Sequence, residues 1–158
     1  MSSFERLRID ITAAAELLRR FSDQQASERP SPERWCLKEV LGHLIDSASN
    51  NHQRFVRAQI AGRLEFPRYE QESWVRVQRY ADAKWDHLID LWQSYNAHLL
   101  HVVACMPPQG QQALCRVGDG KELTLTALFD DYVNHLEHHL GKMLGSWPPA
   151  NLAVHRPS

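Results

Sequence analysis

Apolar residues recur at every third or fourth position along four stretches of the chain, which is the period of an amphipathic α-helix. The four stretches are residues 3–21, 37–61, 82–106 and 124–144. Gly62 is placed to end the second helix, while Asp82 and Thr124 are suitable N-caps for the third and the fourth. Four amphipathic helices predict an all-α protein with the architecture of a four-helix bundle.

The connections between these helices differ in length and character. Residues 23–32 form a polar connection that is closed by prolines, and residues 63–80 form a much longer crossing with room for one short helix. Residues 114–124 place Gly118-Asp-Gly120 between two short runs that can pair as strands. This favours a small β-hairpin just before the fourth helix.

Composition and charge exclude several classes of function. At 158 residues the chain is expected to form a single domain, residues 1–158. A net charge of −1 and a pI near 6.7 give no basic surface for nucleic acid. No apolar run approaches the ~20 residues of a membrane span, and the N-terminus lacks the apolar core of a signal peptide. We therefore expect a cytoplasmic protein with reduced cysteines, which are Cys36, Cys105 and Cys115.

Histidines in two of the predicted helices are the main candidates for chemistry. His135 and His139 are four residues apart, which places both imidazoles on one helix face within reach of one cation. Both lie at the edge of the apolar arc, and His43 occupies the same edge in the second helix. Three neutral nitrogen ligands leave positions open, as in a catalytic metal site. The alternative is that they are isolated solvated histidines, which is how we interpret His87, His98 and His101.

A line of polar residues continues from His43 along the same face of the second helix and comprises Ser47, Asn50 and Arg54. We interpret this line as one wall of a substrate cleft. Arg54 lies eleven residues, or about 16 Å, from His43 and can bind an anionic group, although an ordinary salt bridge is the alternative. Asp46 either orients a metal ligand or faces water. Asn51 falls inside the apolar arc, which predicts a buried, hydrogen-bonded amide.

Four motifs, in this order along the chain, resemble those of one known family. They are Trp35-Cys-Leu-Lys-Glu-Val-Leu-Gly-His-Leu-Ile-Asp46, Asn51-His-Gln-Arg-Phe55, Tyr69-Glu-Gln-Glu-Ser-Trp-Val75 and Tyr132-Val-Asn-His-Leu-Glu-His-His-Leu140. The family is that of the DinB/YfiT-like four-helix metal-binding proteins. The resemblance implies an up-down-down-up bundle and a divalent metal held by His43, His135 and His139. Where many relatives carry glutamine after the histidine pair, this chain has Lys142.

The resemblance also implies a class of activity, because family members with known activity include thiol-dependent S-transferases and a thiol-dependent isomerase. The leading hypothesis is a zinc or nickel enzyme that binds a small-molecule thiol and transfers it to an electrophile. The alternatives are a metal-dependent hydrolase and a stress-associated binding protein without turnover. An open pocket beside the metal favours an enzyme, whereas a metal covered by protein favours the binding protein. No side chain besides the metal ligands stands out as a general base.

The chain is also expected to form a homodimer, the commonest symmetric assembly. It is rich in tryptophan, and two helix faces are candidates for packing against a second copy. One face carries His98 and His101, and the other carries Phe4 and Ile11.

Overall fold

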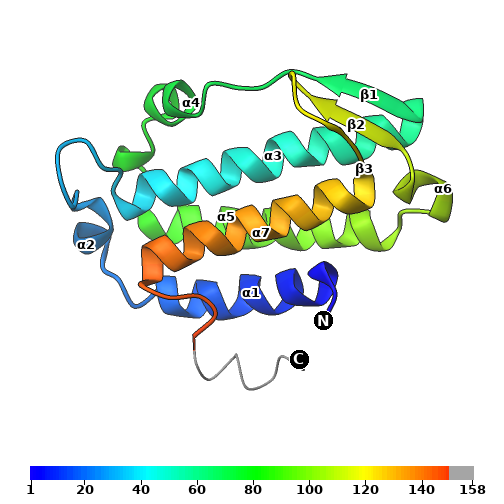
Figure 1. The fold of residues 1–158 in the computed structure, drawn as a ribbon. Coiled ribbons are helices and arrows are strands. Elements are labelled where there is room, and N and C mark those ends of the chain that lie inside the picture. Colours follow the sequence, from blue (N-terminus) through cyan, green and yellow to red (C-terminus); the bar gives the residue numbers. More distant parts are fainter. Residues whose placement is uncertain (150–158) are drawn as a thin grey trace.

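Four long helices make up the body of the protein in a computed structural model that describes residues 1–149 (Figure 1). They are α1 (Ser3–Leu18), α3 (Leu37–Ala61), α5 (Trp85–Ala104) and α7 (Leu125–Leu144). Helices α1 and α7 run in one direction, and α3 and α5 run in the other, which confirms the up-down-down-up topology (Figure 1). The shorter elements are α2 (Asp23–Ser27), β1 (Arg63–Phe66), α4 (Gln71–Gln78), η1 (Tyr80–Asp82), α6 (Pro108–Gln111), β2 (Leu114–Val117) and β3 (Glu122–Thr124).

The core lies between these four helices, each of which packs against two neighbours. Helices α1 and α3 both contact α5 and α7, so that α1 and α3 lie on opposite sides of the bundle. The apolar stripes supply the buried residues, among them Leu7, Leu41, Trp92 and Leu136, all fully buried. Each such side chain contributes about 1.5–3 kcal/mol on burial. On the α1 face that we considered for contact with a second copy, Ile11 is only 6% exposed and Phe4 is half-buried against the core.

A long crossing, which we define as residues 62–84, connects α3 to α5. It must return along the whole bundle, because the two helices are parallel and α5 begins at the end where α3 began (Figure 1). The expected hairpin is present as β2 and β3, which are antiparallel. The crossing adds a strand that was not predicted: β1 pairs parallel to β2, with Arg63 opposite Leu114. Strand β1 has only four residues, which are alternately exposed and half-buried. So short an alternation of polar and apolar residues cannot be recognised in the sequence.

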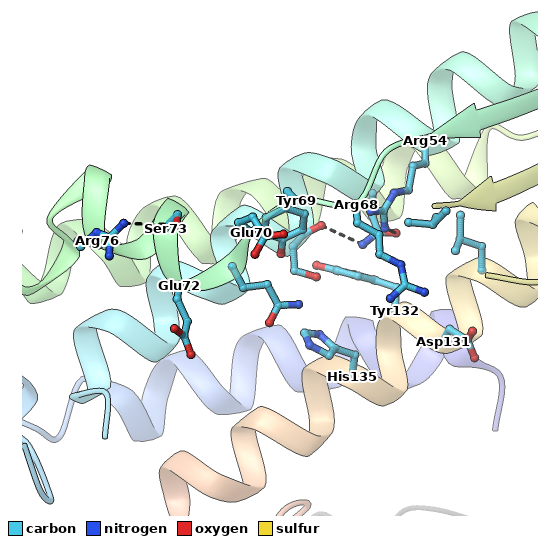
Figure 2. A pocket seen from close by; sticks show the side chains of 15 residues that line it. Arg54, Arg68, Tyr69, Glu70, Glu72, Ser73, Arg76, Asp131, Tyr132 and His135 are labelled. Carbon is cyan, nitrogen blue, oxygen red and sulfur yellow. Dashed lines mark hydrogen bonds between the residues drawn. The ribbon is translucent and has the colours of Figure 1, made fainter. Parts of the chain in front are cut away.

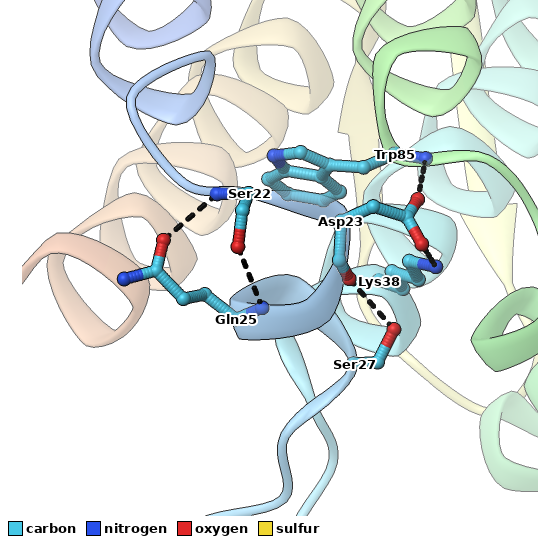
Figure 3. Close-up of polar contacts among 6 residues, drawn as sticks. All are labelled: Ser22, Asp23, Gln25, Ser27, Lys38 and Trp85. Atoms are coloured by element: carbon cyan, nitrogen blue, oxygen red, sulfur yellow. Dashed lines mark hydrogen bonds and ion pairs between the residues drawn. The ribbon is translucent and has the colours of Figure 1, made fainter.

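Asp82 does not cap the third long helix, so this prediction was wrong. Asp82 lies in η1, where its carboxylate forms an ion pair with Arg79 at 2.6 Å. The cap comes from a distant segment (Figure 3): Asp23 accepts the backbone N–H of Trp85 at 2.8 Å and an N–H of Lys38 at 2.9 Å. These two donors hold the pKa of Asp23 below its usual range. The start of α5 is therefore fixed to α2 and α3.

Helix α2 occupies part of the segment that was expected to be a plain polar connection. Its N-cap is Ser22, whose hydroxyl accepts from the N–H of Gln25 at 3.1 Å, while the Gln25 side chain accepts from the N–H of Ser22 at 2.8 Å. This reciprocal pair is a capping box, visible in the sequence as Ser-x-x-Gln.

Among residues 1–149, none of the helices combines the length and apolar content that a membrane span requires.

Candidate metal centre

Three histidines from two neighbouring helices meet near one end of the bundle. Helices α3 and α7 pack side by side in opposite directions, so the beginning of α3 lies next to the end of α7 (Figure 1). His43 comes from the second turn of α3, and His135 and His139 come from the second half of α7. Their ligand nitrogens all lie within 4.8 Å of one another, and no other group of this kind occurs in the described part of the chain.

The spacing of two of these nitrogens matches that of two ligands on one small divalent ion. The Nε2 atoms of His43 and His135 are 3.3 Å apart. Two nitrogens bound to one tetrahedral zinc at about 2.0–2.1 Å are separated by about 3.3 Å. The His139 ring lies with its centroid 4.8 Å from that of His43 and 4.6 Å from that of His135. The donor set is that of an ion with three protein ligands and open positions.

The three imidazoles are held in the neutral form in which histidine binds metals. Burial, together with a smaller contribution from the neighbouring imidazoles, lowers the pKa of His43 to about 4 and that of His139 to about 3. The pKa of His135 is also lowered, mainly by burial. Lys142 adds a positive charge that disfavours protonation of His135 and His139. These histidines therefore need no deprotonation before they bind an ion at neutral pH.

The metal-free protein is expected to lose stability as the pH falls from about 6.5 to about 4. An unfolded chain binds protons on these histidines near pH 6.5, whereas the folded protein does not bind them until the pH approaches the lowered values. Urea unfolding of chelator-treated protein between pH 4.5 and 7.5 measures this slope. His139→Gln should flatten it, while His138→Gln, at an exposed neighbouring position, should not. Equal slopes in all three proteins would contradict the assignment.

Asp46 is buried beside this centre and anchors the crossing. It is 3% exposed, so it does not face water. Its Oδ1 accepts from the Tyr80 hydroxyl at 2.7 Å and from the Gln78 side-chain amide at 2.8 Å. Within the described structure it makes no hydrogen bond to His43, whose buried Nδ1 has no partner. Asp46 thus fixes η1 and α4 against the helix that carries His43.

A pocket of about 660 Å³ opens next to His135 (Figure 2). Its size is within the range of sites for small molecules. Helix α3 contributes one wall, α7 a second, and the crossing a third. Figure 2 shows Tyr132 and His135 on α7, with Arg54 and Arg68 toward the strands and Arg76 at the opposite end. The lining residues from the two helices are Ser47, Asn51, Arg54, Leu128, Asp131, Tyr132 and His135.

The predicted line of polar residues on α3 is divided between two pockets. Ser47 and Arg54 line the pocket beside His135, whereas Asn50 lines a second pocket of about 560 Å³. The Asn50 amide donates to the backbone carbonyl of Asp46 at 2.9 Å. Asn51 is buried and hydrogen-bonded as expected, because its amide donates to the carbonyl of Ser47 at 2.9 Å. It also lines the first pocket, a role that the sequence pattern did not indicate.

The third wall of the pocket was not predicted, because it consists of residues from the crossing. Arg68, Tyr69 and Glu70 belong to it, with Glu72 and Arg76 on α4. Burial raises the pKa of Tyr69 to about 12, so its hydroxyl is a hydrogen-bond donor at neutral pH. The stretch from Tyr69 to Val75 is one of the four family motifs, which was the available sequence signal for this wall.

Comparison with known proteins identifies a family model and several similar folds. Residues 6–143 match the model described as the DinB superfamily. No curated protein sequence matches the chain. The solved structure of YfiT from Bacillus subtilis, described as a probable metal-dependent hydrolase with an unusual four-helix bundle topology, is similar with a TM-score of 0.77. The two share 20% identity over 90% of this chain and 82% of that one.

A second similar structure is that of a mycothiol-dependent maleylpyruvate isomerase, with a TM-score of 0.73 and 13% identity. The similarity covers 87% of this chain but only 57% of the isomerase. The H52A mutant of a mycothiol-dependent maleylpyruvate isomerase has the same TM-score, at 12% identity. At these identities the similarity establishes the fold alone.

Proposed function

The chain belongs to the DinB superfamily, and from this membership and its three-histidine group we propose that it is a metal-dependent enzyme of the thiol S-transferase type. His43, His135 and His139 would hold the divalent ion, for which zinc and nickel suit imidazole ligands. When bound, such an ion acts as a Lewis acid that lowers the pKa of a coordinated thiol. The proposed partners are a small-molecule thiol and an electrophile.

The observation that carries this proposal is the pocket beside His135. A protein that only stores a metal covers it, whereas an enzyme needs room for a substrate next to the ion. The pocket of about 660 Å³ has His135 in its lining, and so reaches the ligand group directly. Side chains from α3, α7 and the crossing line that space.

The chain's own residues would bind the substrates and keep the histidines in the neutral form that binds a metal ion. Burial keeps His43 and His139 neutral, so they remain ligands at neutral pH. In the proposed transfer to a chlorinated aromatic, the thiol sulfur forms a bond to the ring carbon and the carbon–chlorine bond breaks. Chloride leaves with its electron pair, and the thiol proton passes to solvent. This reaction would require no general base in the pocket, because a bound ion would lower the pKa of the thiol enough for its proton to pass to solvent.

Metal-assisted hydrolysis is the second candidate. Its specific support is the presence of three carboxylates in the pocket lining, Glu70, Glu72 and Asp131, any of which can accept a proton from water. YfiT, described as a probable metal-dependent hydrolase, shares the fold. We place this function second because all three carboxylates are exposed and keep their ordinary solvation.

An activity panel tests the proposal. The purified protein is treated with a chelator, reloaded with zinc or nickel, and assayed with 1-chloro-2,4-dinitrobenzene and several low-molecular-weight thiols, in parallel with carboxylic esters and amides. We expect thiol transfer that falls at least ~100-fold without metal, because a Lewis acid contributes several kcal/mol to such a step. Metal-dependent ester hydrolysis without thiol transfer would favour the second candidate. Metal binding with neither activity would favour a binding protein.

A further inference from the structure

Arg54 is a buried cation without an anionic partner among residues 1–149. Its side chain is 8% exposed, and no carboxylate among the described residues forms an ion pair with it. Its Nη1 donates to the Asn51 side chain at 3.3 Å, and the guanidinium lies 5.2 Å from the centre of the Phe66 ring. Its Nε–H is buried and has no hydrogen-bond acceptor. The ordinary salt bridge considered from the sequence is therefore absent.

A guanidinium in this position is costly to the folded protein. Arginine stays charged, so burial cannot be relieved by loss of a proton. A buried charge is normally compensated by a counter-ion and by hydrogen bonds that use all its donors. A single long bond to Asn51 and one aromatic contact leave the buried Nε–H without an acceptor and the charge without a counter-ion. The compensating anion is expected to arrive with a ligand.

The surroundings of Arg54 indicate where that anion would bind. Arg54 lines the pocket that also contains His135, and Asn51 and Tyr69 line the same space. The other two arginines of the pocket are exposed, and Arg68 is already paired with Asp119 at 2.8 Å. The backbone positions of His43 and Arg54 are about 16 Å apart along α3. The pocket therefore contains one of the candidate metal ligands, His135, and an unpaired cation, Arg54, at its end toward the strands (Figure 2).

We propose that Arg54, assisted by Asn51 and Tyr69, is a binding site for the carboxylate of an extended small-molecule thiol. The planar guanidinium fork matches a carboxylate, and the Asn51 amide and Tyr69 hydroxyl supply neutral hydrogen-bonding groups beside it. The thiol identity rests on the proposed function, whereas the anion site rests on Arg54 itself. A thiol and a carboxylate separated by several bonds would span the pocket from the histidines to Arg54.

Two thiols of equal length test the site. They are 6-mercaptohexanoate, which carries a carboxylate, and 6-mercaptohexan-1-ol, which does not, and their binding to zinc-loaded protein is measured by calorimetry. We expect the wild type to bind the carboxylate at least about tenfold more tightly, the effect of one charged hydrogen-bond pair. Arg54→Met should abolish this preference, and Arg54→Lys should retain part of it. An unchanged preference in Arg54→Met would overturn the proposal.

Arg57→Met is the matched control. Arg57 lies one turn further along α3 and contacts the same Phe66 ring, at 5.5 Å, but it is exposed and does not line the pocket. This variant should keep the full preference for the carboxylate. Without ligand, Arg54→Met should melt at or above the wild-type temperature, because it removes an uncompensated buried charge. A fall in Tm for Arg54→Met alone, with the carboxylate preference intact, would show a purely structural role.

A separate probe distinguishes failure of this site from failure of the proposed function. Butyrate has no thiol, and its binding is followed through the Nε–H resonance of Arg54 by NMR, with butyramide as the uncharged control. A shift with butyrate alone supports the anion site even if neither thiol binds the zinc-loaded protein, an outcome that would count against the thiol function. No shift, with both thiols binding equally well, would overturn the anion site and leave the thiol function standing.

Discussion

His139→Ala will leave the purified protein without its divalent ion, whereas the wild type should contain about one ion per chain. Three histidines form the only candidate ligand group among residues 1–149. Removing one leaves two nitrogens, too few to retain an ion through purification. The His43 and His135 nitrogens stay 3.3 Å apart, but no third protein ligand closes the set. Elemental analysis of protein purified without a metal-affinity tag measures the change directly.

The neighbouring His138 provides the control for this experiment. It precedes His139 on α7 and its ring lies 5.6 Å from that of His139, but it is exposed and outside the ligand group. His138→Ala should keep the full metal content, and both variants should show the helical circular dichroism of the wild type. If His139→Ala retains its ion, or if both variants lose it together, the assignment of the ligands is wrong.

Gly42→Ala should destabilise the protein by about 2–3 kcal/mol and lower Tm by roughly 5–10 °C. A Cβ at position 42 would lie 2.1 Å from Cδ2 of Tyr80. The ring cannot easily move away, because it is 7% exposed and its hydroxyl donates to Asp46 at 2.7 Å. The alanine's better helix propensity, about 1 kcal/mol, offsets only part of this overpacking. Thermal and urea unfolding measure the loss.

Gly141→Ala is the matched substitution on α7. A Cβ there would meet Trp147 no closer than 3.7 Å, which is an ordinary contact. The helix propensity of alanine should then stabilise the protein by up to about 1 kcal/mol. Opposite signs for the two variants are expected because only Gly42 faces a fixed ring. A shift of the same sign in both would show that packing against Tyr80 does not explain the glycine at position 42.

The part of the fold that the sequence predicted is the part determined by local periodicity. Helix faces follow from the 3.6-residue repeat, and the common edge position of His43, His135 and His139 follows from the same geometry. The topology then brings these edges together, because α3 and α7 are antiparallel neighbours. The same reasoning placed His98 and His101 on the surface, where both are exposed.

What the sequence did not predict depends on contacts between distant segments. The cap of α5 is Asp23, which is 62 residues from Trp85, so a search near the helix start found Asp82 instead. Asn50 and Asn51 are adjacent, yet they line different pockets, because successive residues of a helix point about 100° apart and the crossing contributes to both pockets. Strand β1 is recognisable only through β2, with which it pairs. Each of these features depends on a contact with a distant segment, and the position of that segment cannot be inferred from the local sequence pattern.

The two helices and the crossing that line the pocket have separate tasks. Helices α3 and α7 carry the histidines, while the crossing supplies Tyr69, Glu70 and Arg76 and none of the candidate ligands. The crossing is joined to α3 through Tyr80 and Gln78, which both bind Asp46. A change of residues 67–77 that preserves those two contacts would alter substrate choice without altering the metal. Such a division lets the specificity of the site diverge by replacement of one peptide segment while its chemistry is inherited unchanged.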